Sequence, residues 1–198
     1  MSNSTANVTP GKPKVTGAIY TALASANPTI PTDATTDLSG YECVGYISED
    51  GVKRAKEISA ETIKAWGGDT VLVTRTENGT TLTFKMIEYL NATVQKVVYG
   101  TDNVSGSLAT GMIVKDVESY KGEERVWVID QIMTGNVKSR TVVPKADITS
   151  VGEIAYKDAE AVGFEITVNA KPDSTGTAVY DYLKETASAG SSGASGTS

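Results

Sequence analysis

One segment, residues 49–103, constrains the fold of this chain more than any other. A charged connector over residues 49–69 leads into two stretches, TVLVTRTE and TTLTFKMIEY, in which β-branched and aromatic residues alternate with polar ones. This alternation is typical of strands with one buried face. Asn78 and Gly79 lie between the two stretches, and this dipeptide suits the positive φ angles of a two-residue turn. We therefore predict a hairpin that turns at Asn78-Gly79.

Alternation also assigns the side chains of the second stretch to faces. Leu82, Phe84 and Met86 share one face of the predicted strand, and Thr81 and Thr83 lie on the other. We expect the apolar face to belong to the core.

A short helix is predicted over residues 91–100. Asn91 is a suitable N-cap, Val94, Val97 and Val98 follow at helical spacing, and Gly100 provides a stop. A helix of this length is not stable alone, so we expect it to pack on the sheet.

The rest of the chain is rich in strand signals. With the hairpin and one helix, they predict a mainly β fold: an antiparallel β-sandwich or distorted barrel with one short α-helix, a long inter-strand loop and extended termini. Residues 27–39, which contain Pro28 and Pro31, are predicted to be a loop. The strand-like runs are residues 17–23, 41–48, 109–117, 125–133, 138–143, 147–156, 163–169 and 178–183.

Composition indicates one domain with polar ends. The domain is expected over residues 14–185, after a flexible N-terminal arm at 1–13 and before a disordered tail at 186–198, which contains only Ser, Gly, Ala and Thr. The start has no signal-peptide pattern, and no apolar run approaches the ~20 residues that span a bilayer, so we expect a protein made and used in the cytosol. The single cysteine, Cys43, permits no internal disulfide and is interpreted as a small buried hydrophobe.

Little in the sequence supports catalysis. Histidine is absent, which removes the commonest general base and metal ligand. No phosphate-binding loop or calcium loop is present, and we expect no enzyme activity, no cofactor and no metal. A net charge of −6 argues against tight nucleic-acid binding. The acidic pairs Glu49 with Asp50, Glu123 with Glu124, and Asp158 with Glu160 are interpreted as solvated surface acids.

The order of these elements resembles that of the major tail tube proteins of long-tailed bacteriophages. The similar features are a charged connector ending in Trp-Gly-Gly-Asp, the strand pair TVLVTRT and TTLTFKMIE, and the helix NATVQKVVYG. Downstream, ERVWVIDQIM and VVPKADITSVGEIAYKDAEAVGFEITVNAKPD are similar to the closing strands of the family, with a Pro-Lys-Ala turn and an acidic Lys-Asp-Ala-Glu loop. The resemblance covers residue 14 to about residue 173.

The resemblance implies a structural virion protein. Subunits of that family form hexameric rings whose inner strands join into a closed barrel around a channel, and the rings stack through terminal arms and a long loop. The implied partners are further copies of the chain, a tape-measure protein, and tail terminator and distal tail proteins. DNA would pass through the channel without specific binding, and the protein would not insert into a membrane. Assembly in the host bacterial cytoplasm would place the protein in the virion tail.

By the same correspondence, residues 49–69 form the stacking loop, which we expect to be mobile in the free subunit. Trp66 is either an anchor that a partner subunit buries or a plug over its own sheet, and the charged residues are either solvated or partners in intersubunit salt bridges. We favour the interface. The predicted contact residues are Lys53, Arg54, Lys56, Glu57, Ile58, Ile63 and Trp66.

An acidic channel would repel the phosphate backbone of DNA. The candidates for channel-facing acids are Glu42, Glu77, Glu88 and Asp130. Alternation separates the two faces of a strand but does not identify the face that lines the channel, so the sequence does not decide which of these acids point inward.

Two other function classes remain. One is another phage or secretion-machine β-sandwich, such as a decoration or host-binding module, which would expose aromatic residues; only Trp66 and Trp127 are available as tryptophans. The other is a hydrolase that uses carboxylates alone in a deep acidic cleft.

Overall fold

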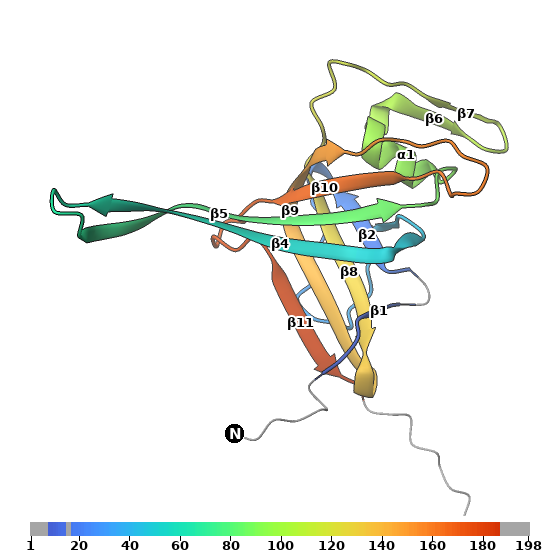
Figure 1. The fold of residues 1–198 in the computed structure, drawn as a ribbon. Helices are drawn as coiled ribbons and strands as arrows, with labels where there is room; N and C mark the ends of the chain where they lie inside the picture. Colours follow the sequence, from blue (N-terminus) through green and yellow to red (C-terminus); the bar gives the residue numbers. More distant parts are fainter. Residues whose placement is uncertain (1–7, 15–16, 187–198) are drawn as a thin grey trace, which may run out of the picture.

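The structure is a computed structural model that describes residues 8–14 and 17–186. It is mainly β, with a single α-helix among the described residues (Figure 1). The strands are β1 (Lys12–Pro13), β2 (Ile19–Leu23), β3 (Glu42–Cys43), β4 (Ile47–Lys64), β5 (Thr70–Met86), β6 (Val104–Ser107), β7 (Gly111–Val114), β8 (Arg125–Met133), β9 (Val137–Val151), β10 (Phe164–Ala170) and β11 (Tyr180–Glu185). The helix is α1 (Ala92–Tyr99), and three 3-10 turns are η2 (Ala24–Ala26), η3 (Thr101–Asn103) and η4 (Thr134–Asn136).

One strongly bent antiparallel sheet forms the framework. Its strand order is β3-β2-β8-β9-β10-β5-β4, with β1 paired to β8 and β11 paired to β9, while β6 and β7 form a separate two-stranded sheet. In the part of the chain that the structure describes, the edge strands β3 and β4 are not joined to each other, so the sheet does not close into a barrel. The expected antiparallel, mainly β architecture with one helix is confirmed.

β9 is the strand on which the sheet bends. Its first half pairs with β11, its second half pairs with β10, and the β8–β9 register shifts where Trp127 faces Val143 and Arg125 faces Ala146. Pro144 lies at this irregularity, where its missing N–H removes no regular ladder bond. The predicted Pro-Lys-Ala turn is therefore wrong, and the two strands expected at 138–143 and 147–156 are one.

The core lies between the β10-β5-β4 part of the sheet and the β2-β8-β9 part. Leu82, Phe84 and Met86 are buried, as the alternation predicts. Phe84 meets Trp127 across the layers edge-to-face, with ring centroids 5.4 Å apart. Burying large side chains of this kind stabilises a fold by about 1.5–3 kcal/mol each, so this contact is central to the core.

Helix α1 covers one end of the core, as expected. The Asn91 side chain accepts a hydrogen bond from the Thr93 backbone N–H at 2.9 Å, and the Gly100 N–H donates to the Lys96 carbonyl at 2.9 Å. Val94 and Val97 are buried against the sheet residues. The predicted cap, apolar face and stop are all confirmed.

The hairpin turns at a different place from the one predicted. β4 and β5 pair from Ile47 with Met86 out to Lys64 with Thr70, with register shifts after Ile47, Ser59 and Ile63. Asn78 lies inside β5, opposite Ile58. The chain reverses over residues 65–69, where the Gly68 N–H donates to the Ala65 carbonyl and Gly68 has φ of +92°. The predicted turn at Asn78-Gly79 is wrong. Gly67 and Gly68, earlier in the chain, lie in the observed turn and permit a much longer ladder of backbone hydrogen bonds.

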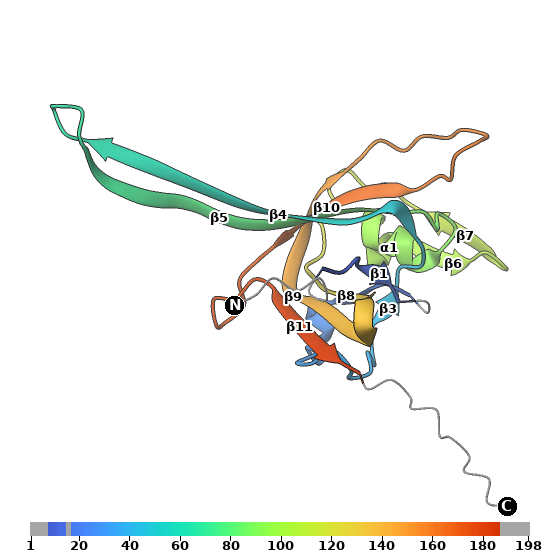
Figure 2. The same ribbon diagram turned by 60° about the horizontal axis from the view of Figure 1, so that its bottom comes forward.

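Residues 49–69 are therefore not a loop. Most of the segment is strand β4, which with β5 forms a ribbon that projects far beyond the rest of the molecule (Figures 1 and 2). The segment has sparse apolar residues with no helical or core pattern, and such a sequence pairs through its backbone without burying a face. The expectation of a mobile loop in the subunit is corrected to an ordered strand.

The predictions for the chain ends mostly concern residues outside the described ranges. Residues 1–7 of the predicted N-terminal arm and residues 187–198 of the predicted tail are not part of the description. In the described ranges, no helix has the length and apolar content needed to cross a membrane.

Replacing Phe84 with alanine should destabilise the subunit by about 3–5 kcal/mol, because the change leaves a cavity against Trp127. The free energy of unfolding in urea measures this. Thr81→Ser on the opposite face is the control and should stay within about 0.5 kcal/mol of wild type. An unchanged midpoint for Phe84→Ala would contradict the assigned core.

Candidate interaction surface

The projecting part of the β4–β5 ribbon, residues 57–79, is here called the hairpin arm. β10 supports β5 only from Thr80 to Met86, so beyond the Lys56–Thr80 pair the two strands bond to each other alone. An isolated two-stranded ribbon is marginally stable in water. A long ribbon of this kind is therefore expected to find further support in a partner.

The hairpin arm carries a dense set of exposed apolar side chains. Trp66, at the tip, is fully exposed, with a relative accessibility of 104%. Six of the exposed large hydrophobic residues lie on the arm: Ile58, Ile63, Trp66, Val71, Leu72 and Val73. Scattered exposed apolar residues are ordinary, but a concentration on one projecting element marks a site of protein association.

Both faces of the ribbon contribute to this apolar surface. Ile63 is paired with Leu72 on one face, and Val73 is paired with Thr62 on the other. A ribbon that is apolar on both faces cannot be covered by lying flat on its own sheet. Trp66 as a plug over its own sheet is wrong, since no part of the described chain covers it.

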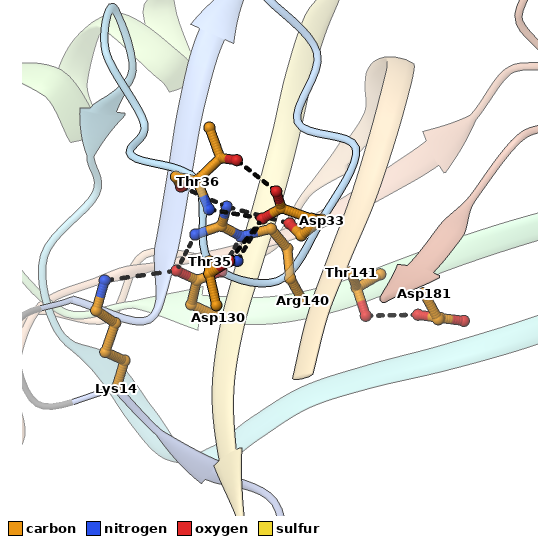
Figure 3. A network of polar contacts seen from close by, with 8 residues as sticks. All are labelled: Lys14, Asp33, Thr35, Thr36, Asp130, Arg140, Thr141 and Asp181. Atoms are coloured by element: carbon orange, nitrogen blue, oxygen red, sulfur yellow. Dashed lines mark hydrogen bonds and ion pairs between the residues drawn. The ribbon is translucent and has the colours of Figure 1, made fainter. Parts of the chain in front are cut away.

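The predicted contact residues all lie on or beside the arm and are exposed. Arg54 forms an ion pair within its own subunit: its Nη1 lies 2.6 Å from the Asp181 carboxylate of β11. The same carboxylate accepts a hydrogen bond from the Thr141 hydroxyl at 2.6 Å (Figure 3). Arg54 thus ties the base of the arm to β11 in its own subunit. The exposed set is Lys53, Arg54, Lys56, Glu57, Ile58, Ile63 and Trp66.

Beside this ion pair is a groove that the sequence did not reveal. It has a volume of about 340 Å³ and separates the base of β4 and β5 from β8, β9 and β11. Apolar side chains line most of it: Val52, Leu82, Ile129, Met133 and Leu183. These residues come from four strands distant in sequence, and only the bend of the sheet brings them together.

Three of the acidic candidates differ in their surroundings. Glu42 is exposed on the edge strand β3, and Glu77 is in β5 opposite Ser59. Glu88 is half-buried, and its carboxylate accepts hydrogen bonds from the Tyr46 backbone N–H at 2.8 Å and the Asn91 amide at 2.9 Å. Glu88 therefore connects the residue before β4 to the N-cap of α1. Of the three, Glu42 and Glu77 remain as channel candidates.

Asp130 does not belong to a channel surface. It is buried on β8, and its carboxylate accepts hydrogen bonds from Arg140 Nε at 2.6 Å and Nη2 at 2.8 Å (Figure 3). Lys14 Nζ lies 3.6 Å from the same carboxylate. A buried carboxylate that is committed to a buried guanidinium presents no charge to a channel, so this prediction is wrong.

The Asp130–Arg140 pair fixes the 27–40 loop over the sheet. Arg140 Nη1 donates to the Thr36 carbonyl at 2.7 Å and to the Asp33 carbonyl at 3.3 Å. Hydrogen bonding to Asp130 raises the pKa of Arg140. Within the loop, the Asp33 carboxylate accepts hydrogen bonds from Thr36 and Thr35, which hold its pKa well below the usual range.

One predicted surface acid also has a structural role. Glu123 is half-buried, accepts a hydrogen bond from the Thr101 N–H at 2.8 Å, and pairs with the buried Arg125 at 2.7 Å. This pair joins β8 to the end of α1. Glu49 and Asp50 are exposed, and Glu160 pairs with Lys157 at 3.2 Å on the surface.

Removing the Asp130 carboxylate should be costly. Asp130→Ala leaves the buried Arg140 charge without its partner, which should destabilise the subunit by about 3–5 kcal/mol. Urea unfolding measures the loss, and Glu42→Gln is the matched control for an exposed acid, with an expected change below about 0.5 kcal/mol. Equal effects of the two substitutions would contradict the assignment of Asp130 to the interior.

Comparison with known proteins gives one family and two structural likenesses. The family described as phage tail tube protein matches residues 1–194 of this chain. The structure resembles a chain of the PVC sheath-tube complex of an extracellular contractile injection system in the extended state, at 9% identity and a TM-score of 0.43, over 92% of this chain and 100% of that chain. It also resembles a chain of the anti-feeding prophage tube-terminating cap, at 7% identity and a TM-score of 0.42, over 93% of this chain and 100% of that chain. No curated protein matches.

Proposed function

Because this chain belongs to the phage tail tube protein family, a family of structural tail components, we propose that it is the major tail tube subunit and forms stacked hexameric rings around a channel for the genome. The observation that carries the proposal is the hairpin arm. It is a long ribbon that is exposed and apolar on both faces, with a fully exposed Trp66 at its tip. Such an element is an unstable extension in a monomer and a useful joint in an assembly.

The arm supplies the contact along the tube axis. Under this proposal the tip meets a different surface of a neighbouring copy, a heterologous contact, and repetition of a heterologous contact builds an open stack. The predicted contact residues Lys53, Arg54, Lys56, Glu57, Ile58, Ile63 and Trp66 lie on the arm or at its base. In the assembly, aromatic and apolar side chains near the tip anchor the interface, and the charges surround it.

The sheet edges supply the contact around the ring. β4 and β3 end the strand order, and each leaves one side without a strand partner among the described residues. Exposed edges favour pairing with another chain. Edge pairing between neighbouring copies joins their sheets into one closed barrel, which leaves no free edge.

The channel would be lined by weakly acidic surface. The chain has a net charge of −6, and Glu42 and Glu77 remain as channel-facing candidates. Acidic walls repel phosphates, so DNA passes without specific binding. Under this proposal the further partners are a tape-measure protein inside the tube and terminator and distal tail proteins at its ends, and assembly takes place in the host bacterial cytoplasm.

Neither alternative class gains support from a specific observation. A decoration or host-binding module would present an aromatic surface, but Trp127 is buried and leaves Trp66 as the one exposed tryptophan. A carboxylate hydrolase would need an acidic cleft; the cavity of about 270 Å³ that contains Asp130 also contains Arg140, which neutralises it.

Shortening the hairpin arm tests the proposal. A variant in which residues 57–79 are replaced by Asn-Gly joins Lys56 to Thr80, which are paired in β4 and β5, through a two-residue turn. All β5–β10 pairs remain, and none of the described side chains in the removed segment is buried, so the subunit should fold with a stability within about 1 kcal/mol of wild type. Electron microscopy should show tubes of the wild-type protein and only unassembled subunits of the variant.

A second variant separates the length of the arm from its apolar surface. Replacing Ile58, Ile63, Val71, Leu72 and Val73 with threonine keeps strand-forming residues but removes every exposed large aliphatic side chain of the arm, with Trp66 left in place. This variant should also fail to assemble. Normal tubes from either variant would reject the hairpin arm as the axial joint.

The charge of the channel predicts how tubes respond to DNA. At about 0.15 M salt, where charges interact over roughly 8 Å, wild-type tubes should not retain double-stranded DNA. Tubes of Glu42→Lys with Glu77→Lys should bind DNA with an affinity that falls as salt rises, whereas Glu49→Lys with Asp50→Lys, a change of equal charge at another site, should bind less. DNA pull-down across a salt series measures this, and salt-sensitive binding by wild-type tubes would contradict a passive channel.

A further inference from the structure

The groove beside the base of the hairpin arm is an open end of the core. Leu82 and Ile129 are only 2% and 3% exposed and belong to the main core cluster, yet both also line the groove. Val52, Met133 and Leu183 line it too, and Leu183 is 63% exposed. The two layers of the sheet thus separate here, and apolar surface that continues from the core meets water.

The described chain does not cover this groove, and its terminal sequences are poorly suited to do so. Residues 1–7 and 187–198 contain, apart from Met1, no apolar side chain larger than alanine. Short polar side chains gain little from burial in an apolar groove. A more apolar segment is needed to fill it.

The tip of the hairpin arm has the matching property. Trp66 has no cover in its own subunit, and Leu72 and Val73 are more than half exposed beside it. The arm cannot fold back into its own groove, because Val52 and Arg54 at its base form one wall and the ribbon then runs away from the domain (Figures 1 and 2). Tip and groove are therefore two uncovered apolar surfaces on one chain that cannot meet within one copy.

We propose that the groove bounded by Val52, Leu82, Ile129, Met133 and Leu183 receives the Trp66 tip of the hairpin arm of a second copy. This inference rests on the proposed function and adds the receiving site to it. A volume of about 340 Å³ is within the range of pockets that hold a large side chain or small ligand, and a tryptophan in a central apolar pocket is the commonest kind of interface anchor. The contact joins unlike surfaces, so each copy can both give a tip and receive one.

The Arg54–Asp181 pair has a place in this arrangement. Arg54 and Asp181 both line the groove, one on the arm side and one on β11, and their 2.6 Å contact links the two walls. The Thr141 hydroxyl donates to the Asp181 carboxylate at 2.6 Å. These contacts order the polar rim of the groove before a partner enters, which lowers the ordering cost of binding.

Cysteine cross-linking between copies tests the contact. In a Cys43→Ser background, Gly67→Cys, which keeps the neighbouring Trp66, is combined with Leu183→Cys, and assembled protein is oxidised and run on a non-reducing gel. The expected result is a ladder of covalent multimers. The control combines Gly67→Cys with Leu108→Cys, an equally exposed position in the β6–β7 turn, and should give at least ten-fold less cross-linking.

Two further measurements do not depend on a disulfide. Leu183→Glu places a charge at the exposed rim of the groove; it should raise the critical concentration for assembly at least ten-fold while the subunit's unfolding midpoint stays unchanged. Trp66 fluorescence, taken as the difference between wild type and Trp66→Phe, should shift to shorter wavelength on assembly as the indole leaves water.

The outcomes separate the inference from the proposed function. Tubes in which Trp66 becomes buried, but which neither cross-link through Leu183→Cys nor respond to Leu183→Glu, would show that the arm docks elsewhere, so the groove assignment would be overturned and the tube proposal would stand. Subunits that remain monomeric at every soluble concentration would overturn both. Equal cross-linking of the test and control pairs would also reject the groove.

Discussion

The backbone ladder between β4 and β5 is the constraint on which the rest of the structure depends. From Ile47 to Lys56 it completes one layer of the core, and from Glu57 outward the same ladder continues without any other strand beside it. The register shifts between Ile47 and Val52 and again between Ser59 and Ala60, so the ladder enters the arm through β-bulges. Because the same two strands form both parts, the domain still sets the direction of the arm.

Polar contacts between elements fix the part of the domain from which the ribbon leaves. Asp130 and Arg140 join β8 to β9 and hold the 27–40 loop, while Arg125 and Glu123 join β8 to α1. Arg54 and Asp181, which are both exposed, join the arm base to β11. Buried ion pairs add little net stability over apolar packing, but any rearrangement that separates the partners is strongly destabilising because it leaves a buried charge unpaired. We interpret them as fixing the relative positions of the strands.

How much of this was predictable from the sequence depended on whether a signal was local. The Asn91 cap, the alternation through Leu82, Phe84 and Met86, and β8 over residues 125–133 were all correct, because each is set by neighbouring residues. The hairpin turn was wrong because the strong local signal of Asn78-Gly79 competes with a long ladder whose benefit appears only when both strands are aligned. Pro144 was misassigned for a similar reason, since a bulge between paired strands and a free turn look alike in one sequence.

The candidate site shows the same division. The sequence singled out the exposed charged and apolar residues of the arm, because an element with neither helical period nor core pattern has few uses inside a domain; their role as contacts stays a prediction. The groove was not found, because its walls come from β4, β5, β8, β9 and β11 and no single stretch carries its signature. Asp130 was misjudged because its partner Arg140 is only identifiable once β8 and β9 are in register.

An assembling subunit must stay soluble until it meets another copy, and the composition of the arm offers a physical account of how it does. On β4 the exposed apolar side chains of the ribbon are separated by charged residues such as Glu57, Glu61 and Lys64, and the whole chain carries a net charge of −6. The ribbon divides its apolar surface between two narrow faces, each too small to drive indiscriminate association, and like net charge keeps free subunits apart. A partner that encloses the ribbon covers both faces at once, so the gain from burial becomes large only for a groove that surrounds the tip. Specific assembly is thereby favoured over flat, nonspecific contact by the geometry of the ribbon itself.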